Sequence, residues 1–304
     1  MAWRLITDLV KHRPATMKIA DRLGRSRMRI RPFETINPPP RTLHTPDLTN
    51  WENQSLAAIW IGHATVLLRI AGMTILTDPV FSNRVGIGLG PFTAGPRRLI
   101  APALSIRQLP PIDLILLSHA HFDHLDRPTL HRLPRQTPII AAHQTQDLIR
   151  DLGFKKITEL RWNESTDLGP LKITARQVSH WGARTFHDTH RGFNAYLLDS
   201  AAHRVLYGGD TAYQEHFRDL ASGRGVDLAI LGIGAYNPYV AAHATPEQAM
   251  RMADHCRAQR ILPMHHSTFR LSHEPASEPL ERALAAIDPD RLVAYQPGGQ
   301  WSAD

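Results

Sequence analysis

Short apolar runs alternate with turn residues along most of the chain. Each run has the length of one β-strand and is bounded by residues that favour turns. The pattern predicts strands at residues 58–61, 66–68, 73–77, 114–117, 139–140, 171–174, 195–198, 205–207 and 228–231. We therefore expect a protein built on sheets of many short strands.

Three segments have a helical pattern instead. They lie at about residues 144–152, 246–258 and 278–287, and the first two begin at plausible N-caps, Thr145 and Thr245. Because helices interleave with strands, the sequence favours an α/β protein built in layers over an all-β sandwich.

Two irregular segments interrupt this order. Residues 31–50 are rich in Pro and Thr and predict an extended linker. We therefore divide the chain into a basic N-terminal arm with its linker, residues 1–50, and one domain, residues 51–304. Residues 84–111 form a Gly/Pro-rich excursion that is too long for a simple turn, and such loops are usually functional or mobile.

The net charge of +7 belongs to the N-terminal arm. Residues 1–33 contain nine Lys/Arg and two Asp, which leaves 26 residues of each sign in the rest of the chain. One interpretation is a solvated tail. Another is an amphipathic segment on an anionic membrane, where each basic side chain contributes about 1 kcal/mol. Nucleic acid is not expected as a partner, because no pattern of stacking aromatic residues accompanies the charges.

Nothing in the sequence indicates a membrane span or a secretory signal. The longest apolar stretch, around residues 56–81, is interrupted by polar and charged residues, among them Arg69 and Asp78. The single cysteine, Cys256, cannot form an internal disulfide, which suits a reducing compartment. We expect a cytoplasmic protein, peripheral at the inner face of the membrane if the arm binds lipid. A homodimer is left open.

A dense run of histidine and aspartate, residues 119–126, directly follows the apolar segment 111–117. Side chains on such a strand-to-helix loop can converge on one point. Neutral imidazoles and a carboxylate are the ligands of a catalytic zinc site. A solvated His-rich loop is the alternative, but three His and one Asp within six residues favour metal. The candidate ligands are His119, His121, Asp123 and His124.

One loop cannot close two metal sites, so we expect further ligands at other strand ends. His180, Asp210 and His265 each follow an apolar run. Taken singly, each has an ordinary alternative as a hydrogen-bonded structural residue. Gly208 and Gly209, just before Asp210, would let the backbone approach the metals closely.

The order of these residues resembles the metallo-β-lactamase superfamily, whose motif is His-x-His-x-Asp-His followed by His, Asp and His. More narrowly, the chain is similar to the N-acyl-phosphatidylethanolamine-hydrolysing phospholipase D family and its bacterial relatives, over about residues 50–270. The matching stretches are residues 60–65, 76–81, 109–113, 118–126, 180–181, 208–211, 234–236, 243–247 and 265–269. The chain departs from that family at two places. It has His266-Ser267 where the family commonly has Trp-Gly, and Asn237-Pro238-Tyr239 where its relatives have Pro-Arg-Trp.

The resemblance implies a four-layer αββα sandwich with two Zn²⁺ ions, or other divalent metals, at the edge of the sheets. It assigns the first ion to His119, His121 and His180, the second to Asp123, His124 and His265, and a bridging role to Asp210.

The resemblance also implies roles for residues around the ions. Asp78 and His63 would lie behind the ligands and fix their orientation. Asp123 would orient the attacking water, and His243 matches a histidine near the substrate phosphate in that family.

The activity implied is attack of a metal-bound hydroxide on a phosphodiester, most simply that of an N-acyl-phosphatidylethanolamine-type phospholipid. A soluble sugar-phosphate lactonase or phosphodiesterase of the same superfamily is one alternative. A non-catalytic binding protein on the same fold is another, although a complete ligand set argues against it. The identity of the substrate and of the metal stays open.

Overall fold

The computed structural model describes residues 38–42, 44–89, 92–185, 187–221 and 223–303. One compact unit extends from Pro38 to Asp304, and the boundary expected at residue 50 falls inside it. The segment before that boundary is tied to the rest, since the backbone N–H of Asp47 donates to the side chain of Gln300 over 2.7 Å. The basic arm at residues 1–33 and its expected membrane contact lie outside the described residues.

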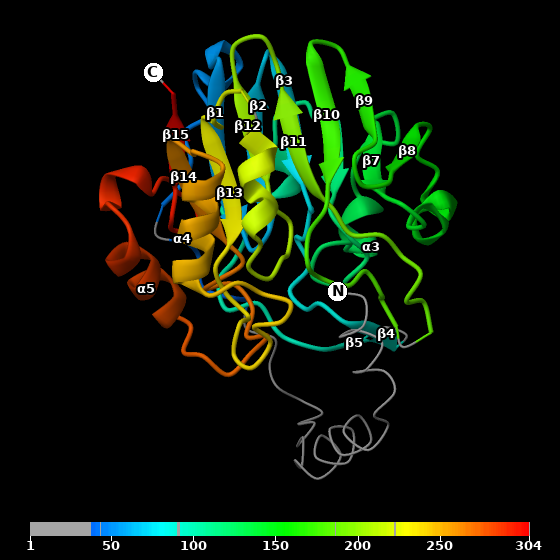
Figure 1. Cartoon of the computed structure of the whole chain (residues 1–304). Helices are drawn as coiled ribbons and strands as arrows, with labels where there is room; N and C mark the ends of the chain where they lie inside the picture. Colours follow the sequence, from blue (N-terminus) through cyan, green and yellow to red (C-terminus); the bar gives the residue numbers. More distant parts are fainter. Residues whose placement is uncertain (1–37, 43, 90–91, 186, 222, 304) are drawn as a thin grey trace. The chain divides into compact units, whose positions relative to one another are not determined.

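Two β-sheets form the centre of this unit (Figure 1). The first has the strand order β15-β1-β2-β3-β6-β7-β8, and the second has the order β14-β13-β12-β11-β10-β9. The strands of the first sheet are β1 Leu56–Gly62, β2 Thr65–Ile70, β3 Met73–Thr77, β6 Leu114–Leu117, β7 Ile139–Ala142, β8 Ile157–Leu160 and β15 Gln300–Ser302. Those of the second are β9 Ser165–Leu168, β10 Leu171–Arg176, β11 Ala195–Asp199, β12 Arg204–Tyr207, β13 Leu228–Gly232 and β14 Arg260–Met264. A separate pair consists of β4 Ile87–Leu89 and β5 Phe92–Ala94.

Helices make up the outer layers. The α-helices are α3 Arg127–Leu130, α4 Pro246–His255 and α5 Glu278–Ala286. Single 3-10 turns or short 3-10 helices lie at Trp51–Asn53, Ile106–Gln108, Gln146–Leu148, Arg150–Leu152, Glu215–Ala221 and Pro289–Arg291. The cap predicted for α4 is confirmed, since the side chains of Thr245 and Gln248 each accept a hydrogen bond from the other's backbone N–H. None of the described helices combines the length and the apolar character needed to cross a membrane.

Burial on both faces of each sheet produces the layers. In β1, Leu56 and Trp60 face the second sheet and share a core cluster with Tyr196, while Ile59 and Ile61 belong to a cluster on the outer face. The outer face of the second sheet is covered by α4 and α5. The predicted αββα sandwich is therefore confirmed.

Strand direction brings several strand ends to one edge. Both β10 and β12 run antiparallel to β11, and β12, β13 and β14 are mutually parallel. In the first sheet, β3, β6 and β7 are parallel. The residues that follow β6, β10, β12 and β14 can therefore meet in space.

The α-helix predicted at residues 144–152 is wrong. Two 3-10 turns occupy the segment, because Ile149 leaves helical backbone angles with φ −131° while its side chain is fully buried against the first sheet. Gly153, with φ 81°, then ends the second turn. Packing of one side chain thus overrides the local helical pattern.

The excursion at residues 84–111 is more ordered than a plain loop. It contains the β4–β5 pair, closed by a bridge between Arg84 and Arg97, and its base pairs with the segment after β14 through a bridge between Arg98 and Phe269. Four strands absent from the predicted set, β8, β9, β14 and β15, complete the sheets. Of these, only β14 was signalled, by the apolar run before His265.

Candidate metal centre

The loop that carries the metal motif joins β6 to α3. Its turn is fixed by the backbone N–H of Leu125, which donates to the carbonyl of His121 over 2.8 Å. Arg184 holds the same loop from outside, because its guanidinium donates to the carbonyls of Ala120 and Leu125 at 2.8 Å each. It also lies over the ring of Phe122, 4.0 Å from its centroid.

A first cluster consists of His119, His121, His180 and Asp210, whose potential ligand atoms all lie within 4.8 Å of one another. His121 Nδ1 lies 2.9 Å from His119 Nε2 and 3.2 Å from His180 Nε2. Burial lowers the pKa of His119 and His180 well below the usual range. Both imidazoles are therefore neutral near pH 7 and can offer a lone pair to a metal ion.

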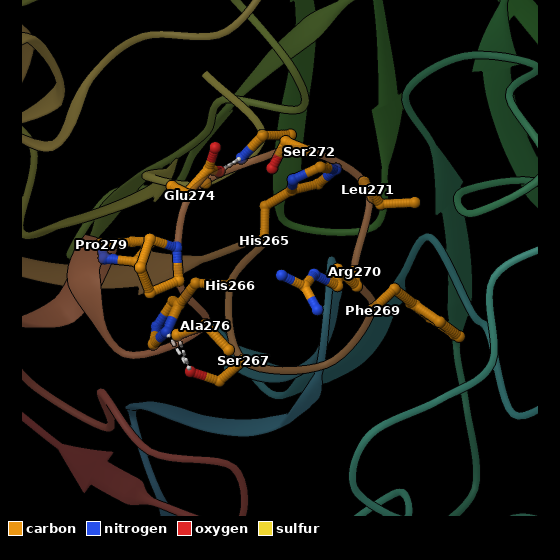
Figure 2. A pocket seen from close by; sticks show the side chains of 13 residues that line it. His265, His266, Ser267, Phe269, Arg270, Leu271, Ser272, Glu274, Ala276 and Pro279 are labelled. Atoms are coloured by element: carbon orange, nitrogen blue, oxygen red, sulfur yellow. Dashed lines mark hydrogen bonds between the residues drawn. The ribbon is translucent and has the colours of Figure 1, made fainter. Parts of the chain in front are cut away.

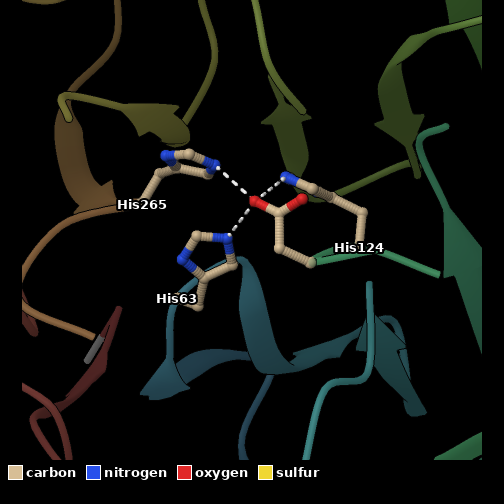
Figure 3. A group of neighbouring side chains, drawn as sticks. His63, His124 and His265 are labelled. Carbon is tan, nitrogen blue, oxygen red and sulfur yellow. Dashed lines mark hydrogen bonds and ion pairs between the residues drawn. The ribbon is translucent and has the colours of Figure 1, made fainter. Parts of the chain in front are cut away.

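A second cluster consists of His63, Asp123, His124 and His265, with the same 4.8 Å limit. Figure 3 shows the imidazoles of His63, His124 and His265 pointing toward one another. Their Nε2 atoms lie 2.9, 3.6 and 3.4 Å from Asp123 Oδ2. His63, expected behind the ligands, thus contacts the Asp123 carboxylate directly.

Asp210 lies between the two clusters. Its Oδ2 is 3.1 Å from His124 Nε2 and 3.2 Å from His265 Nε2, and 3.8 Å from His180 Nε2. His243 Nδ1 is also 3.8 Å away. The carboxylate therefore contacts histidines of both clusters.

The glycines before Asp210 make this approach feasible. A Cβ on Gly209, whose φ is +54°, would lie 2.8 Å from the carbonyl oxygen of Asn194 and 2.9 Å from Ser118 Cβ. Only glycine avoids these clashes at that φ. The close approach at Gly209 is made to neighbouring backbone and to the start of the metal loop, while the expected approach to the metals stays a prediction.

The cluster atoms fit divalent metal ions. His124 Nε2, His265 Nε2 and Asp210 Oδ1 are buried, and among the described residues they have no hydrogen-bond partner. Buried polar atoms without partners are costly and need an explanation. Although burial opposes it, Asp210 and Asp123 raise the pKa of His265 to about 9. The two carboxylates thus attract positive charge, and imidazoles with carboxylates are a zinc-type donor set.

A buried carboxylate braces the second cluster. Asp78 Oδ2 accepts a hydrogen bond from His124 Nδ1 at 2.6 Å and from the Tyr207 hydroxyl at 2.6 Å. The backbone N–H of Ser118 donates to Asp78 Oδ1 over 2.7 Å, and the Ser118 hydroxyl donates to Oδ2 over 2.5 Å. Because Nδ1 of His124 is held in this way, its Nε2 lone pair faces the cluster.

The first cluster is supported differently. His180 Nδ1 donates to the carbonyl of Ala242 over 3.0 Å, and His119 Nδ1 lies 2.8 Å from the Ser118 hydroxyl. Trp181 stacks on His180, with 4.6 Å between ring centroids, and leaves almost half of its surface exposed. This tryptophan marks the edge of the centre that meets solvent.

A small cavity borders His265 on the other side. Figure 2 shows His265 and His266 pointing in different directions from the loop after β14, around this cavity. Its volume of about 30 Å³ suits a water molecule but not a phosphodiester. Substrate must therefore reach the metal centre from elsewhere.

All ten residues singled out in the sequence thus lie in one place. Each belongs to one of the two clusters or contacts a residue that does. Sequence reasoning missed three that support them: Ser118, Tyr207 and Arg184. A polar residue at the end of a buried strand signalled Ser118, and Tyr207 ends a strand just before Asp210. No local signal pointed to Arg184.

A family model described as "Beta-lactamase superfamily domain" matches residues 73–266, most of the two-sheet unit and every residue of the metal centre except His63. The chain belongs to the metallo-β-lactamase superfamily. The sequence resemblance to this superfamily is thereby confirmed, and the chain is a metal-dependent hydrolase.

Relatives within the metallo-β-lactamase superfamily agree with this membership. An uncharacterized protein of Mycobacterium tuberculosis is 33% identical over 272 residues, which cover 85% of this chain and 71% of that protein. The N-acyl-phosphatidylethanolamine-hydrolyzing phospholipase D 1 of Caenorhabditis elegans is 30% identical over 255 residues, or 77% and 70% of the two chains.

A similar solved structure, described as a possible metal-dependent hydrolase from Veillonella parvula, has a TM-score of 0.67. It covers 82% of this chain and 99% of its own at 17% identity, so it supports the fold alone.

Proposed function

We propose that this hydrolase cleaves a phosphodiester of an N-acyl-phosphatidylethanolamine-type phospholipid at a centre of two zinc ions, releasing a phosphatidic acid and the head group. The observation that carries the proposal is Asp210, whose carboxylate lies within 4 Å of histidines from both clusters. The similarity to phospholipases D of 30% identity supports the substrate class.

The ligand assignment follows the two clusters. His119, His121 and His180 would hold one ion, Asp123, His124 and His265 the other, and Asp210 both. Bound there, divalent ions lower the pKa of a coordinated water and offset negative charge on phosphoryl oxygens.

Two side chains would orient the water and the substrate. Asp123 accepts a hydrogen bond from His63 Nε2 at 2.9 Å, which leaves its other oxygen able to orient a water. His243, on the loop before α4, lies beside Asp210. The imidazole of His243 can donate a hydrogen bond to a phosphoryl oxygen.

Charge favours a phosphodiester over a neutral ester. Two divalent ions with only Asp123 and Asp210 as anionic ligands leave a net positive centre. A phosphodiester anion is attracted to such a centre, and its developing charge is stabilised there.

The test is product analysis by mass spectrometry. Zinc-loaded full-length protein is incubated with N-acyl-phosphatidylethanolamine in mixed micelles, and with a panel of soluble phosphodiesters and sugar-phosphate lactones. The proposal expects phosphatidic acid and the N-acylethanolamine, and no product with chelator or with Asp210→Asn.

Two results would decide against it. Cleavage of soluble substrates without any lipid product would favour the soluble phosphodiesterase or lactonase. No hydrolysis of any substrate, together with less than one zinc per chain, would favour the non-catalytic binding protein.

A further inference from the structure

Exposed apolar side chains gather on loops around the metal centre. Among the described residues, seven large apolar side chains are exposed, and five of them have this position. Trp181 follows the ligand His180 directly. The other four are Ile87, Leu89, Tyr239 and Val240, about half exposed or more. We call these five residues the apolar rim.

The β4–β5 pair, which carries Ile87 and Leu89, is anchored beside the second cluster. Its base pairs with Phe269 through Arg98, and the Phe269 ring lies 5.1 Å from the ring of His63. Figure 1 shows β4 and β5 beyond the ends of the sheets, on the same side as the start of α3.

The Tyr239–Val240 turn is anchored beside the first cluster. The backbone N–H of His243 donates to the carbonyl of Tyr239 over 2.9 Å, and the ring of His243 lies 5.0 Å from that of His180. The apolar rim thus approaches the centre from three separate loops.

The charged residues nearest the apolar rim are basic. The segments 79–112, 179–187, 233–246 and 266–273 contain no Asp or Glu. Of their arginines, Arg84, Arg107 and Arg270 are exposed and Arg97 is half-buried. The guanidinium groups of Arg98 and Arg184 instead donate to backbone carbonyls of the protein.

Three carboxylates that follow these segments, Asp188, Glu247 and Glu274, are bonded to Arg191, Arg282 and the backbone N–H of Ala235, respectively. A surface of exposed apolar side chains with arginines and no carboxylates is complementary to an anionic lipid bilayer.

We propose that the apolar rim docks on an anionic bilayer, so that the metal centre opens toward the lipid head groups. Apolar side chains enter the interface, Trp181 and Tyr239 take the position that aromatic residues prefer there, and the exposed Arg84, Arg107 and Arg270 contact lipid phosphates. The inference rests on the proposed function for the identity of the substrate, but docking itself requires no hydrolysis.

A second copy of the chain fits this surface less well. A symmetric dimer through the rim would face the same segments toward each other. Arginines would then meet arginines, with no carboxylate on these segments to pair with them.

The first experiment reports where the bilayer touches. An environment-sensitive fluorophore is attached at Leu89→Cys in the zinc-loaded full-length protein, with Ala202→Cys as the matched control. Ala202 lies on the turn between β11 and β12, at the opposite end of β12 from Asp210. The native Cys256 stays unlabelled, because it is buried and burial raises its pKa to about 12.

Vesicles of phosphatidylcholine with phosphatidylglycerol are then added. We expect a blue shift of emission at position 89 and none at 202. A protein that floats with vesicles but shows no shift at 89 would overturn the proposal. So would a shift at 89 without vesicles that grows with protein concentration, which would indicate a second copy.

The second experiment removes the apolar side chains. Ile87→Asp with Leu89→Asp should lower vesicle partitioning by about 10-fold or more, because two side chains lose their burial. Ala201→Asp with Ala202→Asp adds the same charge elsewhere and should have little effect. Hydrolysis of soluble bis(p-nitrophenyl) phosphate should stay unchanged in both.

Unchanged partitioning of the Ile87/Leu89 variant would overturn the docking surface. Partitioning that depends on these residues while no lipid is hydrolysed would leave the docking surface standing and refute the proposed function.

Discussion

The two clusters of the metal centre are held by different kinds of partner. The second is braced by a fully buried carboxylate, Asp78, which contacts His124, Ser118 and Tyr207. The first relies on neutral groups, a backbone carbonyl on His180 and a hydroxyl near His119. A carboxylate behind a histidine makes it a stronger metal ligand than a neutral acceptor does. We therefore expect the second cluster to bind its ion more tightly and the first to exchange its ion more readily.

The clusters also differ in access. The second is closed on one side by the ring of Phe269, which packs on His63. The cavity beside His265 has a volume of only about 30 Å³. The first borders the exposed Trp181, which lies 5.0 Å from the ring of His121. In the proposed two-ion centre, substrate would approach the accessible first cluster without disturbing the ligands of the enclosed second cluster.

The largest expected effect comes from the residue common to both clusters. Asp210→Ala should remove a ligand from both ions and lower hydrolysis by about 1000-fold or more, since metal catalysis is worth several kcal/mol. Metal content should fall at both sites. Asp167→Ala, an exposed aspartate on β9, is the control and should retain full activity. An Asp210 variant that keeps two ions and its activity would refute the bridging role.

A smaller and selective effect should follow from Asp78→Asn. Loss of the charged partner of His124 should weaken binding at the second cluster by about 10–100-fold. The first cluster should be weakened less, because Asp78 reaches His119 only through the Ser118 hydroxyl. Competition with a chromogenic chelator resolves the two affinities. Tyr207→Phe, which removes one hydrogen bond and keeps the packing, should give the same trend more weakly. Equal weakening of both sites would contradict the comparison.

His63 tests the position of the Asp123 carboxylate. His63→Ala should lower kcat on a soluble phosphodiester by about 10-fold, because Asp123 loses the hydrogen bond that orients it. His63→Gln, whose amide N–H can still donate, should recover part of that loss. The zinc content of both variants is measured beside kcat. If glutamine recovers nothing while zinc content is normal, His63 does more than position Asp123.

The smallest effect is expected at Trp181. Trp181→Ala removes the stacking on His180, worth about 0.5–1.5 kcal/mol, but no ligand. Zinc content should stay at two ions per chain, and kcat on soluble substrate should fall by at most about 10-fold. Loss of the ion at the first cluster would show that the ring, rather than the carbonyl of Ala242, holds His180 in place.

The metal ligands were visible in the sequence because strand ends converge. The run 119–126 is dense enough to suggest metal by itself, whereas His180, Asp210 and His265 gain meaning only as members of a set. Among the orienting partners, Asp78 was expected only from the family resemblance, and Tyr207 was not expected. Asp78 and Tyr207 lie far apart in the chain, and only the packing of the two sheets brings them to one hydrogen bond.

The fold was predictable to a similar extent. Central apolar strands were located because burial on both faces leaves continuous apolar runs. Edge strands such as β15 are short and partly exposed, and β9 is mostly polar, so pairing with a neighbour decides them rather than composition. The segment around Ile149 shows the same limit for helices, because its backbone follows the core and not the local pattern.

Titration calorimetry of zinc into chelator-stripped, full-length protein tests the central claim most directly, with hydrolysis of a soluble phosphodiester followed in parallel. The account predicts two sites per chain of different affinity, the tighter one weakened by Asp78→Asn, and activity that rises as the second equivalent binds. One site or fewer per chain, or full activity with a single ion bound, would contradict a centre of two ions.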